Sequence, residues 1–193
     1  YGVEVVNDVS DCDILIGVKE VNITDLVPGK TYLFFSHTYK QQPYNAKLLA
    51  ALLEKKVSLI DYEMLRGADG RRVIGFGRWA GIVGAYNGLR AWGLRERCFE
   101  LPRAIDCKDL KAMIAQASSV AFPDGMKIVL TGFGRVGCGA AELLDAVGVM
   151  QVDKHDFLES EFEGGAVYAH LGLSDYNERK EGGEFDREAF KKD

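Results

Sequence analysis

The stretch LTGFGRVGCGAAELLD, residues 130–145, joins the end of an apolar strand to a glycine run and an amphipathic helix. Gly132, Gly134 and Gly137 form a G-x-G-x-x-G pattern in the strand, turn and helix context that a dinucleotide-binding fingerprint requires. In that fingerprint the first glycine permits a tight turn, the second lets the backbone approach a pyrophosphate, and the third lets the helix lie close to the strand. The pattern predicts an anion site at the start of the helix, and a glycine-rich turn without a ligand is the structural alternative.

Three neighbouring residues extend the predicted cofactor site. Arg135 stands inside the glycine run with Val136 beside it, and its guanidinium is suited to a charge-assisted contact with a phosphate. Asp153 lies nineteen residues after Gly134, on a strand expected over 147–156, where an acidic group accepts the ribose hydroxyls of NAD. Lys154 beside it weakens that choice, so a solvated carboxylate and NADP in place of NAD both stay open.

The first part of the chain alternates apolar strands with a helix. Strands are expected over 13–18, 31–37 and 57–62, and a helix over 43–56 places leucines at helical spacing. Strand, strand, helix and strand in this order predict a second α/β lobe with a parallel sheet.

Titratable side chains follow the ends of these strands. Lys19 and Glu20 end the first strand, His37 ends the second, and Glu63 follows the third. Because α/β sheets keep their ligand crevices at the carboxyl ends of their strands, we expect these groups to share one crevice. Histidine and desolvated lysine carry protons near neutral pH. A surface position is the alternative for each of them taken alone.

A long helix expected over 79–96 contains Gly81, Gly84, Gly88 and Gly93. Each glycine costs a helix about 1 kcal/mol relative to alanine, so their repetition predicts close approach by another backbone. A homodimer contact and packing against the chain's own second lobe are both consistent with this pattern.

The expected organisation has three parts in α/β architecture. Residues 1–78 form a catalytic lobe that we expect to be truncated at its N-terminus, because the chain opens without methionine. Residues 79–126, with a second helix over 106–117, connect it to a dinucleotide-binding lobe over 127–193. A complete dinucleotide domain needs about six strands, so only its first half is expected here. Both Rossmann-like lobes are therefore predicted to be incomplete.

Composition excludes several classes of partner. The formal charge is -5, and no basic block is long enough to follow a nucleic-acid backbone. No apolar run reaches the roughly 20 residues of a membrane span, and no signal peptide opens the chain, so a cytoplasmic protein is expected. The four cysteines have no metal-ligand spacing, so we expect no metal.

Five motifs occur in an order that resembles a known family: GVKE, FFSHTYKQQ, LIDYE, GRRVIGFGRWAGIVGAYNGLRAWG and GFGRVGCGAAELL. They resemble the lysine-forming saccharopine dehydrogenases, within the superfamily of alanine dehydrogenase and the transhydrogenase α-subunit. The resemblance covers residues 13–144. The lysine, glutamate and histidine pattern is shared across the superfamily, whereas the histidine followed by TYK is closer to saccharopine dehydrogenase.

The resemblance implies an NAD-dependent oxidative deamination in which saccharopine is cleaved to lysine and 2-oxoglutarate through an imine. Lys19 and His37 match the acid-base pair of the family, and Glu20 and Glu63 match carboxylates that tune it. A substrate with several carboxylates also needs guanidinium groups. Arg90 stands where the family has an arginine, whereas Arg78 stands where a less polar residue is expected, and helix capping or surface pairing is the alternative for both arginines.

Two other functions remain open at this level. The chain also fits an alanine dehydrogenase or transhydrogenase-type NAD(H)-binding domain with a smaller substrate or none. A catalytically idle NAD-binding protein would keep the glycine loop without turnover. In each case the expected partner is a small molecule, an amino acid for the two enzymes.

Overall fold

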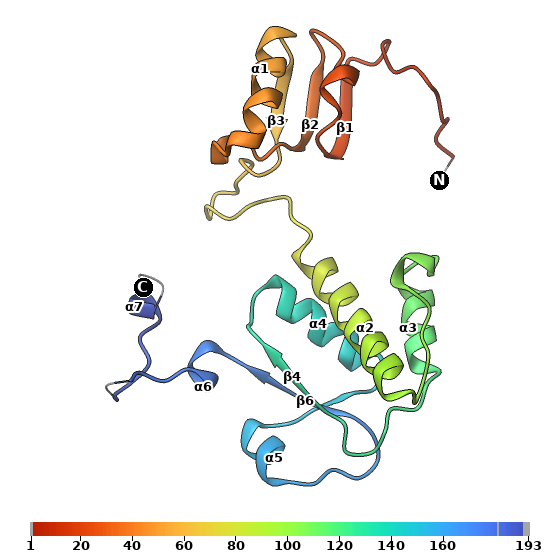
Figure 1. The fold of residues 1–193 in the computed structure, drawn as a ribbon, viewed down its shortest axis with the longest axis vertical. Helices are drawn as coiled ribbons and strands as arrows, with labels where there is room; N and C mark the ends of the chain where they lie inside the picture. Colours follow the sequence, from red (N-terminus) through yellow and green to blue (C-terminus); the bar gives the residue numbers. More distant parts are fainter. Residues whose placement is uncertain (1, 181, 191–193) are drawn as a thin grey trace. The chain divides into compact units, whose positions relative to one another are not determined.

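The computed structural model describes residues 2–180 and 182–190, and the chain divides into two compact units, Tyr1–Gly75 and Phe76–Asp193 (Figure 1). Each unit contains a parallel sheet accompanied by helices. The predicted α/β class with Rossmann-like parallel sheets is confirmed.

The first unit carries a parallel sheet with the strand order β1-β2-β3. In chain order its elements are β1 Ile14–Lys19, η1 Ile23–Asp25, β2 Thr31–Phe35, η2 Thr38–Lys40, η3 Pro43–Asn45, α1 Ala46–Glu54 and β3 Ser58–Asp61. The expected strands and helix are all present, with ends that differ from the expected ones by a few residues.

The core of this unit lies between α1 and the sheet. Leu48 and Leu52 are one turn apart on α1, so they share the helix face that is buried against Tyr32 and Phe34 of β2. The Tyr32 hydroxyl is satisfied because it accepts the Val27 backbone N–H at 2.9 Å. The three strands are parallel, so their carboxyl ends meet at one edge of the sheet.

The second unit carries a parallel sheet with the strand order β4-β6-β5. In chain order its elements are α2 Gly77–Glu96, η4 Ala104–Asp106, α3 Leu110–Ser118, β4 Lys127–Thr131, α4 Arg135–Ala146, β5 Met150–Gln151, α5 Lys154–Glu159, β6 Val167–Leu171, α6 Leu173–Tyr176 and α7 Arg187–Phe190. The helices α2 and α3, in the stretch assigned to connecting helices, belong to this unit.

The strand expected over 147–156 is wrong in extent. β5 covers only Met150–Gln151, because Asp153 begins α5 as its N-cap and accepts the His155 backbone N–H at 2.8 Å. The strand β6 lies between β4 and β5, so β5 is not the neighbour of the strand that leads into the glycine loop.

The glycines of α2 differ in what surrounds them. A Cβ on Gly81 would lie 1.9 Å from the Val136 carbonyl oxygen, and one on Gly139 of α4 would lie 2.1 Å from the Arg78 carbonyl oxygen. The two helices therefore cross at backbone contact, side by side in Figure 1. The predicted close approach is confirmed at Gly81, and the partner backbone is α4.

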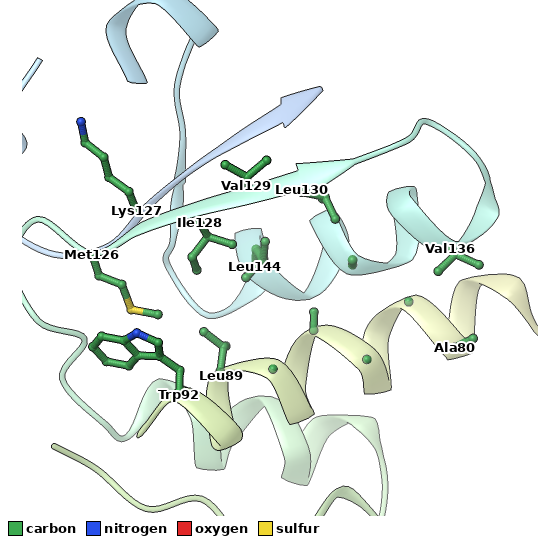
Figure 2. A pocket seen from close by; sticks show the side chains of 15 residues that line it. Ala80, Leu89, Trp92, Met126, Lys127, Ile128, Val129, Leu130, Val136 and Leu144 are labelled. Carbon is green, nitrogen blue, oxygen red and sulfur yellow. The ribbon is translucent and has the colours of Figure 1, made fainter. Parts of the chain in front are cut away.

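Gly84 and Gly88 instead face an apolar groove of about 520 Å³ between α2, α4 and β4, shown in Figure 2. A Cβ on either glycine would meet no atom within 4 Å. Trp92 and Met126 close one end of the groove, and Val136 lines the other end. Close approach by a backbone does not explain these two glycines.

Candidate active site and cofactor loop

The carboxyl ends of β1, β2 and β3 bring the predicted acid-base residues of the first unit together. Lys19 is the last residue of β1 and pairs in register with Phe35. His37 follows β2 by two residues, and Glu63 follows β3 by two residues. Parallel strands place all three side chains at one edge of the sheet, as the sequence predicts.

His37 stands between Lys19 and Glu63. Its Nδ1 lies 2.7 Å from Glu63 Oε2, and its Nε2 lies 3.4 Å from Lys19 Nζ. Glu63 is 3% exposed, whereas His37 is partly exposed and Lys19 is exposed. The three groups form a chain of contacts that runs from a buried carboxylate through an imidazole to an amine near solvent.

Two cations that the sequence analysis did not single out complete the surroundings of Glu63. Lys40 Nζ lies 3.3 Å and Arg72 NH1 lies 3.5 Å from Glu63 Oε1. Their side chains are 39% and 48% exposed, so both reach from solvent to a buried carboxylate. Lys40 follows His37 by three residues across the η2 turn, and this spacing was the available signal for it.

A second carboxylate, Asp61, ties together the ends of β2 and β3. Its Oδ2 accepts the Ser36 hydroxyl at 2.6 Å, and its Oδ1 accepts the Glu63 backbone N–H at 2.9 Å. Ser36 is fully buried, and its oxygen accepts the Thr38 backbone N–H at 3.1 Å. Both residues that flank His37 are thereby fixed, and His37 itself has a left-handed backbone with φ of 57°.

Glu20 does not line the same site as its predicted partners, Lys19 and His37. It lines a separate cleft of about 520 Å³ that also contains Asn22 and Tyr44. The hydrogen bonds and ion pairs of the described residues around Lys19 and His37 do not include its carboxylate. Its role in tuning the pair stays a prediction.

The glycine loop of the second unit has the backbone geometry that its sequence demands. Gly132 has φ of +86°, a conformation that favours glycine, and Gly134 is the N-cap of α4 with an extended backbone. A Cβ on Gly137 would lie 1.8 Å from the Gly132 carbonyl oxygen, so only glycine fits there. A Cβ on Gly134 would meet no atom within 4 Å, so its backbone stands open.

A cleft of about 630 Å³ lies against this loop. Gly132, Phe133 and Gly134 form one wall, and Gly172, residues of α6, Phe185 and Arg187 line the rest of the cleft. Arg135 begins α4 next to this wall. Val136 lines the apolar groove beside α2, and its predicted contact with the cofactor stays a prediction.

Asp153 lines another polar cleft, of about 560 Å³, with Lys154, His170 and Asp175. Lys154 Nζ lies 2.7 Å from Asp175 Oδ1, and this ion pair lowers the pKa of the Asp175 carboxyl below its usual value. The ribose contact predicted for Asp153 stays a prediction, since its carboxylate also caps α5.

The two predicted substrate arginines have protein partners inside the second unit. Arg78 makes a two-pronged ion pair with Glu142 of α4, with Nε 2.7 Å from Oε2, and lies over the Trp79 ring. Arg90 Nε donates to the Leu101 carbonyl at 3.0 Å. These contacts match the structural alternative for both residues, and their substrate role stays a prediction.

Within residues 2–180 and 182–190, the helices are too short or too polar to cross a membrane, and no three His, Cys, Asp or Glu side chains gather as metal ligands would.

Comparison with known proteins finds a family match over the first part of the chain and a likeness of fold over most of it. Residues 1–83 match the family model described as alanine dehydrogenase/PNT, N-terminal domain. A solved L-alanine dehydrogenase superposes with a TM-score of 0.51 at 16% identity, over 88% of this chain and 46% of that chain. This likeness shows the fold.

Curated relatives point to a narrower group. The chain is 31% identical over 159 residues to an alpha-aminoadipic semialdehyde synthase of Arabidopsis thaliana, and the match covers 74% of this chain and 15% of that protein. It is 30% identical over 173 residues to a saccharopine dehydrogenase [NAD(+), L-lysine-forming] of Candida glabrata, and the match covers 84% of this chain and 46% of that protein. The chain thus spans less than half the length of these relatives. The resemblance read from the motifs is confirmed at the level of the superfamily.

Proposed function

We propose that this chain acts in NAD-dependent oxidative deamination, the reversible cleavage of saccharopine to L-lysine and 2-oxoglutarate. The observation that carries the proposal is the contact chain of Lys19, His37 and Glu63 at the carboxyl edge of the first sheet. Relatives named saccharopine dehydrogenase and alpha-aminoadipic semialdehyde synthase support this substrate over a smaller amino acid.

The proton steps match two carriers in contact. Oxidation of the secondary amine to an imine releases the proton from nitrogen, and addition of water to the imine carbon moves one water proton to that nitrogen. When the C–N bond of the carbinolamine breaks, its hydroxyl proton moves to the departing lysine nitrogen and the ketone forms. NAD, when bound, accepts the hydride from the C–H bond. Lys19 and His37 divide the remaining proton transfers, and the 3.4 Å between Nζ and Nε2 lets a proton pass between them.

Glu63 sets the orientation of His37. A carboxylate only accepts, so the 2.7 Å contact requires the proton on Nδ1 and leaves Nε2 to accept from the Lys19 amine in the neutral ring. This tautomer is assigned from the hydrogen-bond network. Lys40 also lies 3.3 Å from His37 Nδ1, but both groups are donors there, so its effective partner is Glu63.

The residues of the glycine loop fit a dinucleotide. The open backbone at Gly134 and the N-terminus of the twelve-residue helix α4 are suited to a pyrophosphate, and Arg135 supplies a cation there. Asp153 is the proposed acceptor for ribose hydroxyls. Lys40 and Arg72, partly exposed beside Glu63, join Arg78 and Arg90 as candidates for the substrate carboxylates.

The test is NADH oxidation by the full chain with lysine plus 2-oxoglutarate, run beside pyruvate plus ammonia and beside NADPH. Turnover with the first pair that is lost in Lys19→Met supports the proposal. Turnover with the second pair alone assigns the chain to alanine dehydrogenase chemistry. NADH binding without turnover in either reaction contradicts the enzymatic role and indicates a catalytically idle binding protein.

A further inference from the structure

A histidine outside the predicted site contacts the glycine loop. His170 lies on β6, where it pairs in register with Leu130 of β4. Its Nε2 lies 2.7 Å from the carbonyl oxygen of Gly132, the first glycine of the loop. Because a carbonyl only accepts, this contact requires the imidazole proton on Nε2.

Both polar backbone groups of Gly132 are therefore held by consecutive residues of β6. The Gly132 N–H donates to the Leu171 carbonyl at 2.8 Å, and the Gly132 carbonyl accepts from His170. Gly137 packs against the same carbonyl oxygen, since a Cβ there would lie 1.8 Å from it. Gly132 is thus hydrogen-bonded to β6 through both of its polar backbone groups, and it packs against Gly137 in the first turns of α4.

The imidazole also orders the next residue of the loop. The Phe133 ring lies with its centroid 4.2 Å from that of His170, at an interplanar angle of 33°. Phe133 forms part of the wall of the loop cleft, beside Gly132 and Gly134. One side chain therefore holds two consecutive residues of the loop by two different contacts.

These contacts act on the polarity of the loop. A loop that binds a pyrophosphate must turn its N–H groups toward the anion and its carbonyl oxygens away from it. A carbonyl bound to a donor on the neighbouring strand cannot rotate toward the anion without losing that hydrogen bond. Glycine permits a wider range of backbone angles than other residues, so the Gly132 carbonyl depends on such a bond to keep its direction.

We propose that His170 is a positioning residue that holds the glycine loop in the conformation that accepts a dinucleotide pyrophosphate, through the Nε2 to Gly132 hydrogen bond. The inference rests on the proposed function for the identity of the ligand. It assigns no contact between His170 and the ligand itself.

Two substitutions separate the donor from the ring. His170→Phe keeps a ring to stack on Phe133 and loses the donor, whereas His170→Gln loses the ring and keeps an N–H donor at a similar reach. His155→Phe and His155→Gln, at an exposed position of α5, are matched controls. NADH affinity is measured by fluorescence titration of the full chain, and amide hydrogen exchange of residues 132–137 is measured without cofactor.

The expected result is a loss of NADH affinity of about threefold to tenfold in His170→Phe, the range of one net hydrogen bond, with recovery to within about twofold in His170→Gln. Loop amides should exchange faster in His170→Phe than in His170→Gln. Equal affinity and equal exchange in wild type and His170→Phe overturn the inference. The inference is also overturned if both variants lose NADH affinity equally and in proportion to their loss of unfolding free energy, because packing alone then explains the loss.

The exchange measurement keeps this inference distinct from the proposed function. If the wild-type chain does not bind NADH, the proposed function fails, and the loop amides still decide the role of His170. Faster exchange confined to the variant without a donor then supports the positioning role, and unchanged exchange refutes it.

Discussion

His37 Nδ1 and Glu63 Oε2 lie 2.7 Å apart, and this hydrogen bond joins a partly exposed imidazole to a carboxylate that is buried almost completely. The carboxylate in turn lies within ion-pair distance of Lys40 and Arg72. A buried charge is stable only when it is paired and hydrogen-bonded, and Glu63 has three partners for this purpose. The arrangement therefore makes the charge of Glu63 a requirement for the order of this edge.

Glu63→Gln should destabilise the first unit by about 1–3 kcal/mol, because an amide leaves two cations without their buried counter-charge. The expected value is below that of a fully buried ion pair, since Lys40 and Arg72 are partly solvated. Urea unfolding followed by circular dichroism measures the change. Glu54→Gln, at the exposed end of α1, is the control and should be neutral. A neutral Glu63→Gln would contradict the assigned ion-pair cluster.

Lys19→Met and His37→Gln should each lower kcat by about 10²-fold or more in the proposed reaction, with NADH affinity retained. Because Nζ and Nε2 are in contact, the double variant should lose much less than the product of the two single losses. Steady-state rates and NADH titrations of all four proteins measure this. Lys30→Met, at the opposite edge of the sheet, is the control. Fully multiplicative losses would show that the two residues act independently.

Asp61→Asn should lower kcat roughly tenfold to a hundredfold without touching a reacting atom, because small displacements of catalytic groups carry large costs. Asp61 accepts the hydroxyl of buried Ser36 on one oxygen and the Glu63 backbone N–H on the other, and an amide keeps only one accepting oxygen, so one of the two bonds is lost. NADH affinity should stay at the wild-type value, since the glycine loop lies in the other unit. Asp69→Asn in an exposed turn is the control. An unchanged kcat would limit Asp61 to a structural role.

The second unit should lose stability at alkaline pH through two buried tyrosines. Burial, with a smaller contribution from its contact with Cys107, raises the pKa of Tyr86 to about 12, and burial together with its hydrogen bond to Asp145 raises the pKa of Tyr168 well above its usual range. The unfolded chain ionises near pH 10, so it binds fewer protons than the folded chain above that pH. The stabilisation is complete below about pH 10 and is lost as the pH rises through the folded values.

Unfolding midpoints followed by tryptophan fluorescence between about pH 9 and pH 12 measure this loss. Tyr86→Phe and Tyr168→Phe should each flatten the dependence, whereas Tyr176→Phe, at an exposed position, should leave it unchanged. A wild-type midpoint that stays constant over this pH range would contradict the predicted loss of stability.

The sequence predicted the elements with strong local signals and missed the contacts made across loops. The strand Lys127–Thr131 and the turn into α4 follow from an apolar run and three glycines, and the structure places both as expected. Arg72 and His170 had no such signal, because their roles depend on which distant carboxylate or carbonyl the fold brings to them. Lys40 had only its spacing from His37, which does not reveal that its partner is Glu63. Asp153 falls within the strand expected over 147–156, whereas the structure shows it as the N-cap of α5, where its side chain accepts the His155 backbone N–H.

Gly81→Ala and Gly84→Ala should change stability in opposite directions, although both lie on α2. A Cβ on Gly81 would lie 1.9 Å from the Val136 carbonyl oxygen and 2.7 Å from the Ala140 nitrogen, so α4 must shift, at a net cost of about 1–3 kcal/mol. A Cβ on Gly84 meets no atom within 4 Å, so the gain in helix propensity remains, about 0.5–1 kcal/mol.

Trp79 and Trp92 both lie on α2, so urea unfolding followed by their fluorescence reports on the unit that these substitutions change. Gly88→Ala provides a second position with open surroundings and should behave like Gly84→Ala. Stabilisation by Gly81→Ala would show that α2 and α4 do not cross at backbone contact. Destabilisation by both Gly84→Ala and Gly88→Ala would contradict the open surroundings of these two glycines in the groove of Figure 2.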